Sequence, residues 1–354
     1  MRRVVKFCSV LLGMSLSACA NTGYYFQAIN GQLLVLEAKR PIADVIADPA
    51  APPTLKEKLA AVQHIRAFAG RALGLPNGKS YRHYADLRRR YVLWNVFAAP
   101  EFSVQPNEWC LLFAGCVNYR GYFFEDGARA YAERLRAQGY DVFVGGVPAY
   151  STLGWFGDPV LNTFIHYPEQ ELAQLLFHEL AHQIVFVPGD TMFNESFATA
   201  VQQEGMRRWL DQQGDAAQRA AYQCAQQRQR TFINLVLRYR GELEELYARD
   251  INVVEKRAAK ARILRELQTE FDRLRRDDAG LEKFAGWFSE PPNNAQLASL
   301  ALYTQWVPAF QALLAQCDDD LPRFYEEVKA LAKLAPEARA ARLTALTEKT
   351  ANAS

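Results

Sequence analysis

The stretch HELAHQIVFVPGDTMFNESFA, residues 178–198, constrains the fold more than any other part of the chain. His178 and His182 are four residues apart. On a helix this spacing corresponds to about 400° of rotation, so both imidazoles leave one face a single turn apart. A Pro-Gly pair then breaks the helix, and Glu195 opens a second helical pattern after twelve intervening residues. The sequence therefore predicts a second helix that runs back beside the first, with Glu195 facing both histidines.

These three side chains match the ligand requirements of one Zn²⁺ ion. Imidazole nitrogens bind zinc at about 2.0–2.1 Å, and a carboxylate third ligand leaves the fourth position open for water. Glu179 is one step round the helix from His178, where it can act as the general base on the attacking water. Five histidines and 39 acidic residues make a chance occurrence of the pattern rarer than about 1% per chain. The alternative is a buried helix face with two hydrogen-bonded histidines and no metal.

The motif also carries a family resemblance. HExxH followed by NExxA resembles the gluzincins, zinc peptidases that include thermolysin-like and membrane-alanyl-aminopeptidase-like families. The interval to Glu195 is shorter than their usual spacing, so the chain belongs to neither of these two. Three further segments complete the resemblance: GCVNYRGYF (115–123), VPAYSTLGWFGDP (147–159) and NNAQLASLALYTQWVPAF (293–310). Over nearly the full mature chain, they resemble a family of bacterial lipoproteins described as putative aminopeptidases, which implies a metallopeptidase architecture.

Residues 1–18 are expected to be a secretory signal peptide. A basic N-terminus precedes an apolar run at residues 7–16, which is too short to span a bilayer. The following tetrad, LSAC, resembles the lipobox of bacterial lipoproteins, in which Cys19 becomes the lipidated N-terminus. By the same resemblance, Ala20 favours the outer membrane. We therefore expect a soluble body that faces the periplasm of a Gram-negative bacterium on a lipid tether; the alternative is an ordinary secretory signal.

The remaining cysteines suit an oxidising compartment. Outside the predicted signal and anchor the chain has four: Cys110, Cys116, Cys224 and Cys317. An even count in a secreted protein predicts disulfides, and four cysteines allow three connectivities. We favour a tight Cys110–Cys116 loop together with a Cys224–Cys317 bridge. The alternative is free buried thiols, which a protein core accommodates well.

The pattern of apolar residues predicts an α+β, helix-dominated fold with a zincin-like catalytic core. We expect one metallopeptidase domain over residues 19–354, with a helical part at 20–100, a small mixed sheet plus zinc-site helices at 101–213, and a helical part at 214–354. A net charge of +2 without a basic tail argues against nucleic acid as a partner. The expected helices are 31–39, 55–74, 126–138, 170–186 and 195–213, and the expected strands lie within 92–113, 117–124 and 140–147. Residues 81–94 resemble a helix, or a helix running into a strand.

Several further residues are candidates for roles in catalysis or substrate binding. Tyr303 is the preferred donor to the oxyanion, ahead of Tyr150 and Tyr167. The substrate strand is expected along residues 140–147 or 149–156. The candidates for a carboxylate that pairs with a free substrate amine are Asp158, Glu169 and Glu204. Asn293 and Asn294 either cap a helix or bind substrate, with capping favoured, and we interpret His64, His83 and His166 as structural.

Together these features predict a lipid-anchored, zinc-dependent peptidase acting on peptide or protein substrates, and the resemblance favours an aminopeptidase. Three alternatives stay open. The first is a zinc endopeptidase acting on envelope proteins. The second is a catalytically inactive lipoprotein that binds envelope components. The third is an assembly factor with structural zinc, which is disfavoured because structural zinc sites have four protein ligands.

Overall fold

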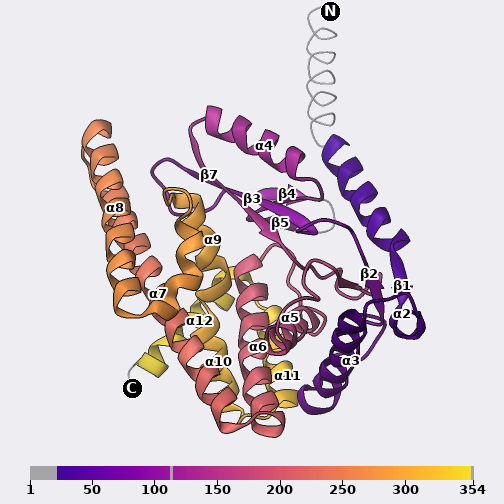
Figure 1. Ribbon diagram of the computed structural model, residues 1–354. Coiled ribbons are helices and arrows are strands. Elements are labelled where there is room, and N and C mark those ends of the chain that lie inside the picture. Colours follow the sequence, from indigo (N-terminus) through magenta and orange to yellow (C-terminus); the bar gives the residue numbers. More distant parts are fainter. Residues whose placement is uncertain (1–21, 112–114, 352–354) are drawn as a thin grey trace, which may run out of the picture.

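The computed structural model describes residues 22–111 and 115–351 (Figure 1). The predicted signal peptide at residues 1–18 and the predicted lipidation site Cys19 lie outside these residues. No helix in the described ranges combines the length and apolar character needed to cross a membrane. The architecture is α+β and dominated by helices, which confirms the predicted fold class.

The central sheet has three antiparallel strands in the order β6 (Arg120–Tyr122), β3 (Leu93–Pro100) and β7 (Tyr140–Val147). β3 and β7 pair along their whole lengths, from Leu93 opposite Val147 to Pro100 opposite Tyr140. Side chains alternate between the two faces of a sheet. One face, with Val96 and Ala98, packs against α4 (Glu125–Ala137), and the other, with Phe97 and Ala99, packs against α9 (Asn294–Thr304).

Two smaller sheets flank the centre. The first is mixed: β2 (His83–Ala85) pairs antiparallel with β1 (Lys39–Pro41) and parallel with β8 (Val160–Leu161). The second is a hairpin of β4 (Trp109–Leu111) and β5 (Gly115–Val117). Cys110 and Cys116 pair across this hairpin and form a disulfide, as predicted.

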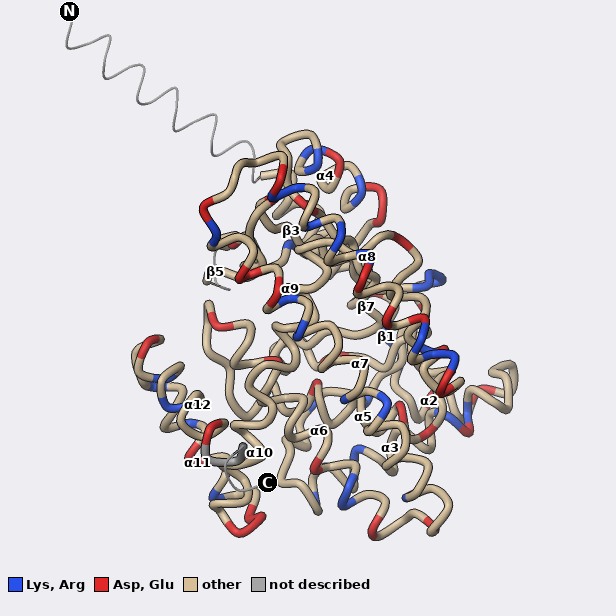
Figure 2. The backbone as a smooth tube through the Cα atoms, turned by 90° about the vertical axis from the view of Figure 1, so that its left-hand side faces the viewer, with Lys and Arg blue, Asp and Glu red and all other residues tan. Residues whose placement is uncertain are grey.

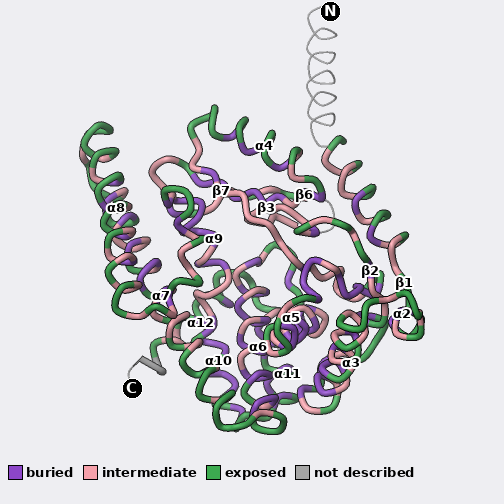
Figure 3. The backbone as a smooth tube through the Cα atoms, in the orientation of Figure 1, coloured by how far each residue is buried: buried purple, intermediate pink, exposed green. Residues whose placement is uncertain are grey.

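The main hydrophobic core lies among helices and includes the two that carry the segment 178–198. It unites residues 22–37, which are helical, with seven further helices. These are α2 (Ile42–Ala47), α3 (Pro53–Leu73), α5 (Glu169–Ala181), α6 (Thr191–Gln213), α10 (Val307–Gln316), α11 (Leu321–Ala332) and α12 (Pro336–Ala351). Phe68, Phe177 and Trp209 join α3, α5 and α6 in an aromatic cluster. Figure 3 shows buried positions concentrated in α5 and α6, so the zinc-site motif lies in the interior.

A helical hairpin with its own core forms one side of the molecule (Figure 1). It consists of α7 (Ala216–Ala248) and α8 (Val253–Asp277), and the 3₁₀ segment η1 (Ala279–Phe288) packs against both. Ile263, Leu267 and Phe271 recur at four-residue steps and are buried, so they form the apolar stripe that α8 turns toward its neighbours. Figure 2 shows basic and acidic residues interspersed over the outer helices rather than separated by sign.

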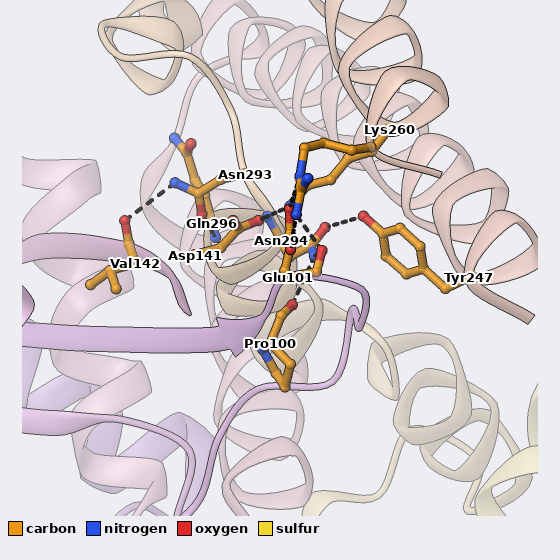
Figure 4. Close-up of polar contacts among 10 residues, drawn as sticks. Pro100, Glu101, Asp141, Val142, Tyr247, Lys260, Asn293, Asn294 and Gln296 are labelled. Atoms are coloured by element: carbon orange, nitrogen blue, oxygen red, sulfur yellow. Dashed lines mark hydrogen bonds and ion pairs between the residues drawn. The ribbon is translucent and has the colours of Figure 1, made fainter. Parts of the chain in front are cut away.

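A buried polar network joins this hairpin to the sheet and to α9 (Figure 4). Asn294 is fully buried; its Nδ2 donates to the carbonyl oxygens of Pro100 and Glu101 at 3.1 and 2.9 Å, and its Oδ1 accepts from Tyr247 at 2.8 Å. The Asn294 backbone N–H donates to Asp141 at 2.9 Å, and Lys260 donates to the same carboxylate at 2.7 Å. The ends of β3 and β7 are therefore attached to α7, α8 and α9.

Asn293 and Asn294 accordingly have structural roles. Asn293 is the N-cap of α9, accepts a hydrogen bond from the Gln296 N–H at 3.1 Å and donates to Val142 at 3.2 Å. The predicted capping role is confirmed for Asn293, whereas Asn294 caps no helix and instead joins β3 to α7.

The predicted boundaries are wrong in four places. The helix predicted at residues 31–39 covers residues 22–37 of the described chain. Residues 81–94 form no helix, because Tyr81 and Arg88 have φ values of 59° and 51° in the left-handed region and the chain turns at both. α5 ends at Ala181 rather than at residue 186. The prediction extended the helix because Val185 and Val187 continue the apolar pattern, but these residues are buried in the core from a loop. α6 begins at Thr191, since Asp190 caps it by accepting from the Phe193 N–H at 3.0 Å.

The predicted Cys224–Cys317 bridge is also wrong. Both thiols are free. Cys224 is exposed on α7, whereas Cys317 is buried at the C-cap of α10. Cysteine count alone could not show that the two residues lie in different environments on different helices.

We predict that Asn294→Ala lowers the free energy of unfolding by about 2–4 kcal/mol, because it removes hydrogen-bond partners from buried groups on three segments. Tyr247→Phe is the matched control, since it removes a single hydrogen bond of the same network and should cost about 1 kcal/mol. Urea unfolding of both variants measures the difference. Equal losses would show that Asn294 does not organise this junction.

Candidate metal centre

His178 and His182 lie on the last turn of α5 and at its C-cap. Two rows of buried apolar side chains attach α5 to the core. One row consists of Leu172, Leu176 and Leu180, and the other of Ala173 and Phe177. The two histidines project from an adjacent face, and their ring centroids are 5.0 Å apart. The four-residue spacing therefore places both imidazoles at one point, as predicted.

The chain reverses between the two helices through a loop that Asn194 holds. Its Nδ2 donates to the Val187 carbonyl and its Oδ1 accepts from the Val187 N–H, both at 2.8 Å. Asp190 caps α6 and accepts from Arg339 at 2.8 Å. These contacts satisfy buried backbone groups of the short connection. Asn194 is the first residue of the NExxA motif, and its role in the loop could not be predicted from that position alone.

Glu195 faces both histidines. Its Oε2 lies 3.1 Å from Nε2 of His178 and 3.7 Å from Nε2 of His182. One ligand atom from each of the three residues lies within 4.8 Å of the others. Among the described residues, these three are the group of His, Cys, Asp or Glu side chains close enough together to hold one metal ion. Tetrahedral zinc ligands at ordinary bond lengths are about 3.3 Å apart. The predicted ligand set is therefore assembled at distances that fit one ion.

The next residue along α6 fixes a different part of the site. Ser196 is fully buried and its Oγ accepts from the backbone N–H of Trp306 at 3.2 Å. This bond attaches the junction of α9 and α10 to α6 one residue after the ligand Glu195. Tyr303 lies one turn before Trp306, so the bond also determines where α9 presents this tyrosine.

Burial sets the protonation of the ligands. Desolvation lowers the pKa of His182 to about 4, so this imidazole is neutral at pH 7. Burial raises the pKa of the Glu195 carboxyl, but the two neighbouring histidines lower it by more. The pKa therefore lies below its ordinary value, and the carboxyl is ionised. Burial lowers the pKa of His178, but the hydrogen bond with Glu195 and the charge of that carboxylate raise it by more. The net effect is a pKa above the ordinary value of histidine. Neutral imidazole and ionised carboxylate are the forms that bind zinc, and His182 and Glu195 are in these forms, whereas the raised pKa of His178 favours its protonated form, which would release a proton on binding the metal.

Glu179 has a different electrostatic environment from Glu195. Burial raises its pKa to about 7; the positive charge of His178 opposes this shift, and the negative charges of Glu195 and Asp158 add to it. A carboxyl group with a pKa near neutrality can both accept and release a proton at pH 7. One buried carboxylate is thus suited to hold a metal and the other to transfer protons.

The metal-ligand cluster opens into a cavity of about 430 Å³. The C-terminal end of β7 lines it through Gly146 and Val147, and the following segment contributes Tyr150. Phe186 and Tyr303 also line it. β7 is an edge strand of the central sheet, whereas residues 149–156 form no strand. Of the two candidate substrate strands, the structure therefore places 140–147 at the site as a strand.

The three tyrosine candidates differ in their surroundings. Tyr303 lines the cavity, and its pKa is raised well above the ordinary value by burial and then by the charge of Glu195. Tyr150 lines the cavity too, but its hydroxyl donates to Gln32. Tyr167 does not line this cavity and packs against the ring of His166. Tyr303 thus remains the leading candidate.

Tyr119 was missed by the sequence analysis. It lines the cavity, its ring contacts Phe97 on β3, and its pKa is raised first by burial and then by the charges of Glu195 and Glu179. The only signal in the sequence was its place within the segment GCVNYRGYF. A second hydroxyl therefore accompanies that of Tyr303 at the site.

The structure brings none of the three candidate amine-binding carboxylates into the cavity. Asp158 accepts hydrogen bonds from Thr152, including its backbone N–H at 3.1 Å. Glu204 pairs with two arginines of its own helix, and Glu169 is exposed at the start of α5. The carboxylates that line the cavity in the described part of the chain are Glu179 and Glu195. His64, His83 and His166 lie outside it as well.

Comparison with known proteins gives one match. A family model described as "Putative aminopeptidase" matches residues 23–343. No curated protein and no solved structure matches the chain.

We predict that Zn²⁺ raises the melting temperature of the chelator-treated protein and that Glu195→Ala removes this effect. A ligand that binds only the folded state at 1,000 times its Kd adds about 4.1 kcal/mol of stability. Thermal unfolding with and without zinc measures it. His166→Ala is the control, because this histidine lies outside the cluster. A zinc-dependent shift that persists in Glu195→Ala would contradict the assigned ligand set.

Proposed function

The chain belongs to the aminopeptidase family whose model it matches, and on that premise we propose that it is a zinc-dependent peptidase. The observation that carries the proposal is the convergence of His178, His182 and Glu195 at distances that suit one Zn²⁺ ion. Two imidazoles and one carboxylate leave a coordination position open, which is typical of catalytic rather than structural zinc. The proposed ligands are those three residues.

The neighbouring side chains supply the remaining parts of amide hydrolysis. In such a site, zinc supplies Lewis-acid activation of water and of the substrate carbonyl. Glu179 takes a proton from the attacking water and delivers it to the leaving amine nitrogen, which its pKa of about 7 permits in both directions. Tyr303 donates a hydrogen bond to the oxyanion, because its hydroxyl belongs to the same cavity and is protonated at neutral pH.

The substrate backbone is proposed to pair with the free edge of β7. β7 is bonded to β3 on one side only, and its last residues, Gly146 and Val147, line the cavity. An extended peptide that adds to a sheet edge gains main-chain hydrogen bonds irrespective of its sequence. This arrangement places a peptide bond beside the metal ligands without requiring a particular side chain.

Aminopeptidase activity is the favoured form of this function, because the family bears that description. An endopeptidase is the second candidate. Among the described residues, the 430 Å³ cavity offers no carboxylate beyond Glu179 and Glu195 to pair with a charged α-amine, and Glu171 lines only the neighbouring hollow beside His178 and Glu179. Peptides with free and blocked amines separate the two. A catalytically inactive envelope-binding lipoprotein would cleave neither kind.

We also propose that the protein acts in the periplasm on a lipid tether at Cys19, at the outer membrane. The Cys110–Cys116 disulfide supports an oxidising compartment, where such bonds persist.

We predict that Glu179→Gln keeps the zinc and lowers kcat about 10²- to 10⁴-fold, because an amide cannot take the proton from water. Metal analysis and cleavage of a tetrapeptide library by the protein without residues 1–19 test both statements. Wild-type protein with no stoichiometric zinc, or a Glu179→Gln variant that cleaves as fast as the wild type, would refute the proposed mechanism.

Tyr303→Phe should lower kcat about 10²- to 10³-fold with little change in KM, since an oxyanion donor acts mainly in the transition state. The matched control is Tyr222→Phe, which removes a hydroxyl on α7 that lines a different cavity. Steady-state kinetics of the two variants measure the effect. If Tyr303→Phe stays within twofold of the control, Tyr303 is not the donor and Tyr119 takes its place as the candidate.

A further inference from the structure

A second hollow adjoins the metal cavity along α5. It has a volume of about 240 Å³ and shares Leu175, His178 and Glu179 with that cavity. The rest of its lining consists of polar side chains from both ends of the α5–α6 pair: Tyr167, Glu171, Gln174 and Gln202. A peptide whose scissile bond lies beside His178 and Glu179 would therefore have a neighbouring side chain next to this hollow.

One face of α5 leads from the metal ligands into the hollow. Glu171, Leu175, His178 and His182 follow one another at steps of three or four residues, which places them on one face of the helix. At 1.5 Å per residue, the seven residues from Glu171 to His178 span about 10 Å along the helix axis. The Glu171 carboxylate thus belongs to the same surface as the ligands without being part of their cluster.

The Glu171 carboxylate is available to a ligand. Its side chain is exposed and has no hydrogen bond or ion pair among the described residues. Lys283 of η1 is near enough to sense its charge: burial lowers the pKa of Lys283, Arg228 lowers it further, and Glu171 opposes both. The Lys283 ammonium, however, lies over the ring of Phe284, 4.8 Å from its centroid. No lysine or arginine lines the hollow in the described part of the chain.

The two amides of the hollow are already engaged. Gln202 donates through Nε2 to Oε1 of Gln174 at 3.2 Å, and Gln174 donates to the Gln170 carbonyl at 3.4 Å. The uncompensated negative charge of the hollow therefore lies on Glu171 at its outer end and on Glu179 beside the metal ligands.

These groups suit a long side chain that ends in a positive charge. Lysine and arginine carry an apolar stem, which packs on apolar surface, and a charged end that stays near water. Leu175 offers apolar surface between the metal ligands and Glu171. The charged end would meet the Glu171 carboxylate and the ring of Tyr167, and cations are attracted to both kinds of group.

The separation of about 10 Å also selects a side chain over an α-amine. The α-amine of the residue that supplies the scissile carbonyl lies within one residue length, about 3.5 Å, of that carbonyl. Such an amine stays beside the metal ligands and does not reach Glu171. A lysine or arginine side chain can extend along the helix face toward it.

We propose that this hollow binds the lysine or arginine side chain of a peptide at a residue next to the scissile bond, with Glu171 pairing with the charged end. The inference rests on the proposed peptidase function and names a substrate class for it, peptides with a basic residue at the cleaved bond. Glu171 is a specificity residue; it takes no part in metal binding or proton transfer.

Peptides that differ at one position test the assignment. A tetrapeptide series carries lysine, norleucine or glutamate on each side of the scissile bond in turn, and all members keep the same α-amine. We expect wild-type kcat/KM to be about 2- to 5-fold higher for lysine than for norleucine on one side of the bond, the range of an exposed ion pair. Glu171→Gln should abolish this difference, and Glu171→Lys should place glutamate above lysine.

Glu169→Gln and Glu169→Lys are the matched controls. Glu169 is likewise an exposed acidic residue in the first turn of α5, but it does not line the hollow. Both pairs of variants change the charge at the start of α5 equally, so an effect on the helix dipole or on folding would appear in both. We expect all four variants to cleave the norleucine peptide within twofold of the wild type and the Glu169 variants to keep the lysine preference.

A lysine preference that persists in Glu171→Gln, or that Glu169→Gln removes equally, would overturn the inference. Equal cleavage of the lysine and norleucine peptides by the wild type would overturn it too, while leaving the peptidase proposal intact. Wild-type protein that holds no zinc and cleaves no peptide of the series would instead refute the peptidase proposal, and this inference with it.

Discussion

The contact of Glu195 with two histidines, a hydrogen bond with His178 at 3.1 Å and a close approach to His182 at 3.7 Å, is the interaction on which the rest of the structure depends. It joins two buried helices at a point where three polar side chains are shielded from water. Burying such groups is unfavourable unless each finds a partner. The apolar rows of α5 and the loop that Asn194 holds keep the two helices in this arrangement. The proposed zinc ion would satisfy all three ligands at once, which explains why the core is built around them.

The remaining parts of the site come from distant segments that are attached to this pair of helices. Ser196 binds the junction of α9 and α10, which positions Tyr303, and the Asn294 network attaches α9 to the ends of β3 and β7. The sheet in turn contributes the edge of β7 to the cavity. A change far from the ligands, at Asn294 for example, can therefore alter the geometry of the site through α9.

Local features were predictable from the sequence, and long-range ones were not. The strand at Tyr140–Val147 and the helix near 126–138 follow from periodicity, and the ligand cluster follows from the histidine spacing and a turn. The early end of α5 was missed because apolar residues beyond it are buried in a loop. The separation of Cys224 from Cys317 and the presence of Tyr119 in the cavity both depend on which strands and helices become neighbours. No short segment encodes that information.

The central claim is that one zinc ion is held by two imidazoles and one carboxylate with a position left open. X-ray absorption at the zinc edge tests it most directly on the purified protein loaded with one equivalent of zinc. The account predicts a shell of nitrogen and oxygen neighbours at about 2.0–2.2 Å, with the scattering pattern of two imidazoles and no sulfur. A zinc–sulfur distance of about 2.3 Å, which would implicate Cys224 or Cys317, or a shell without imidazole, would contradict it.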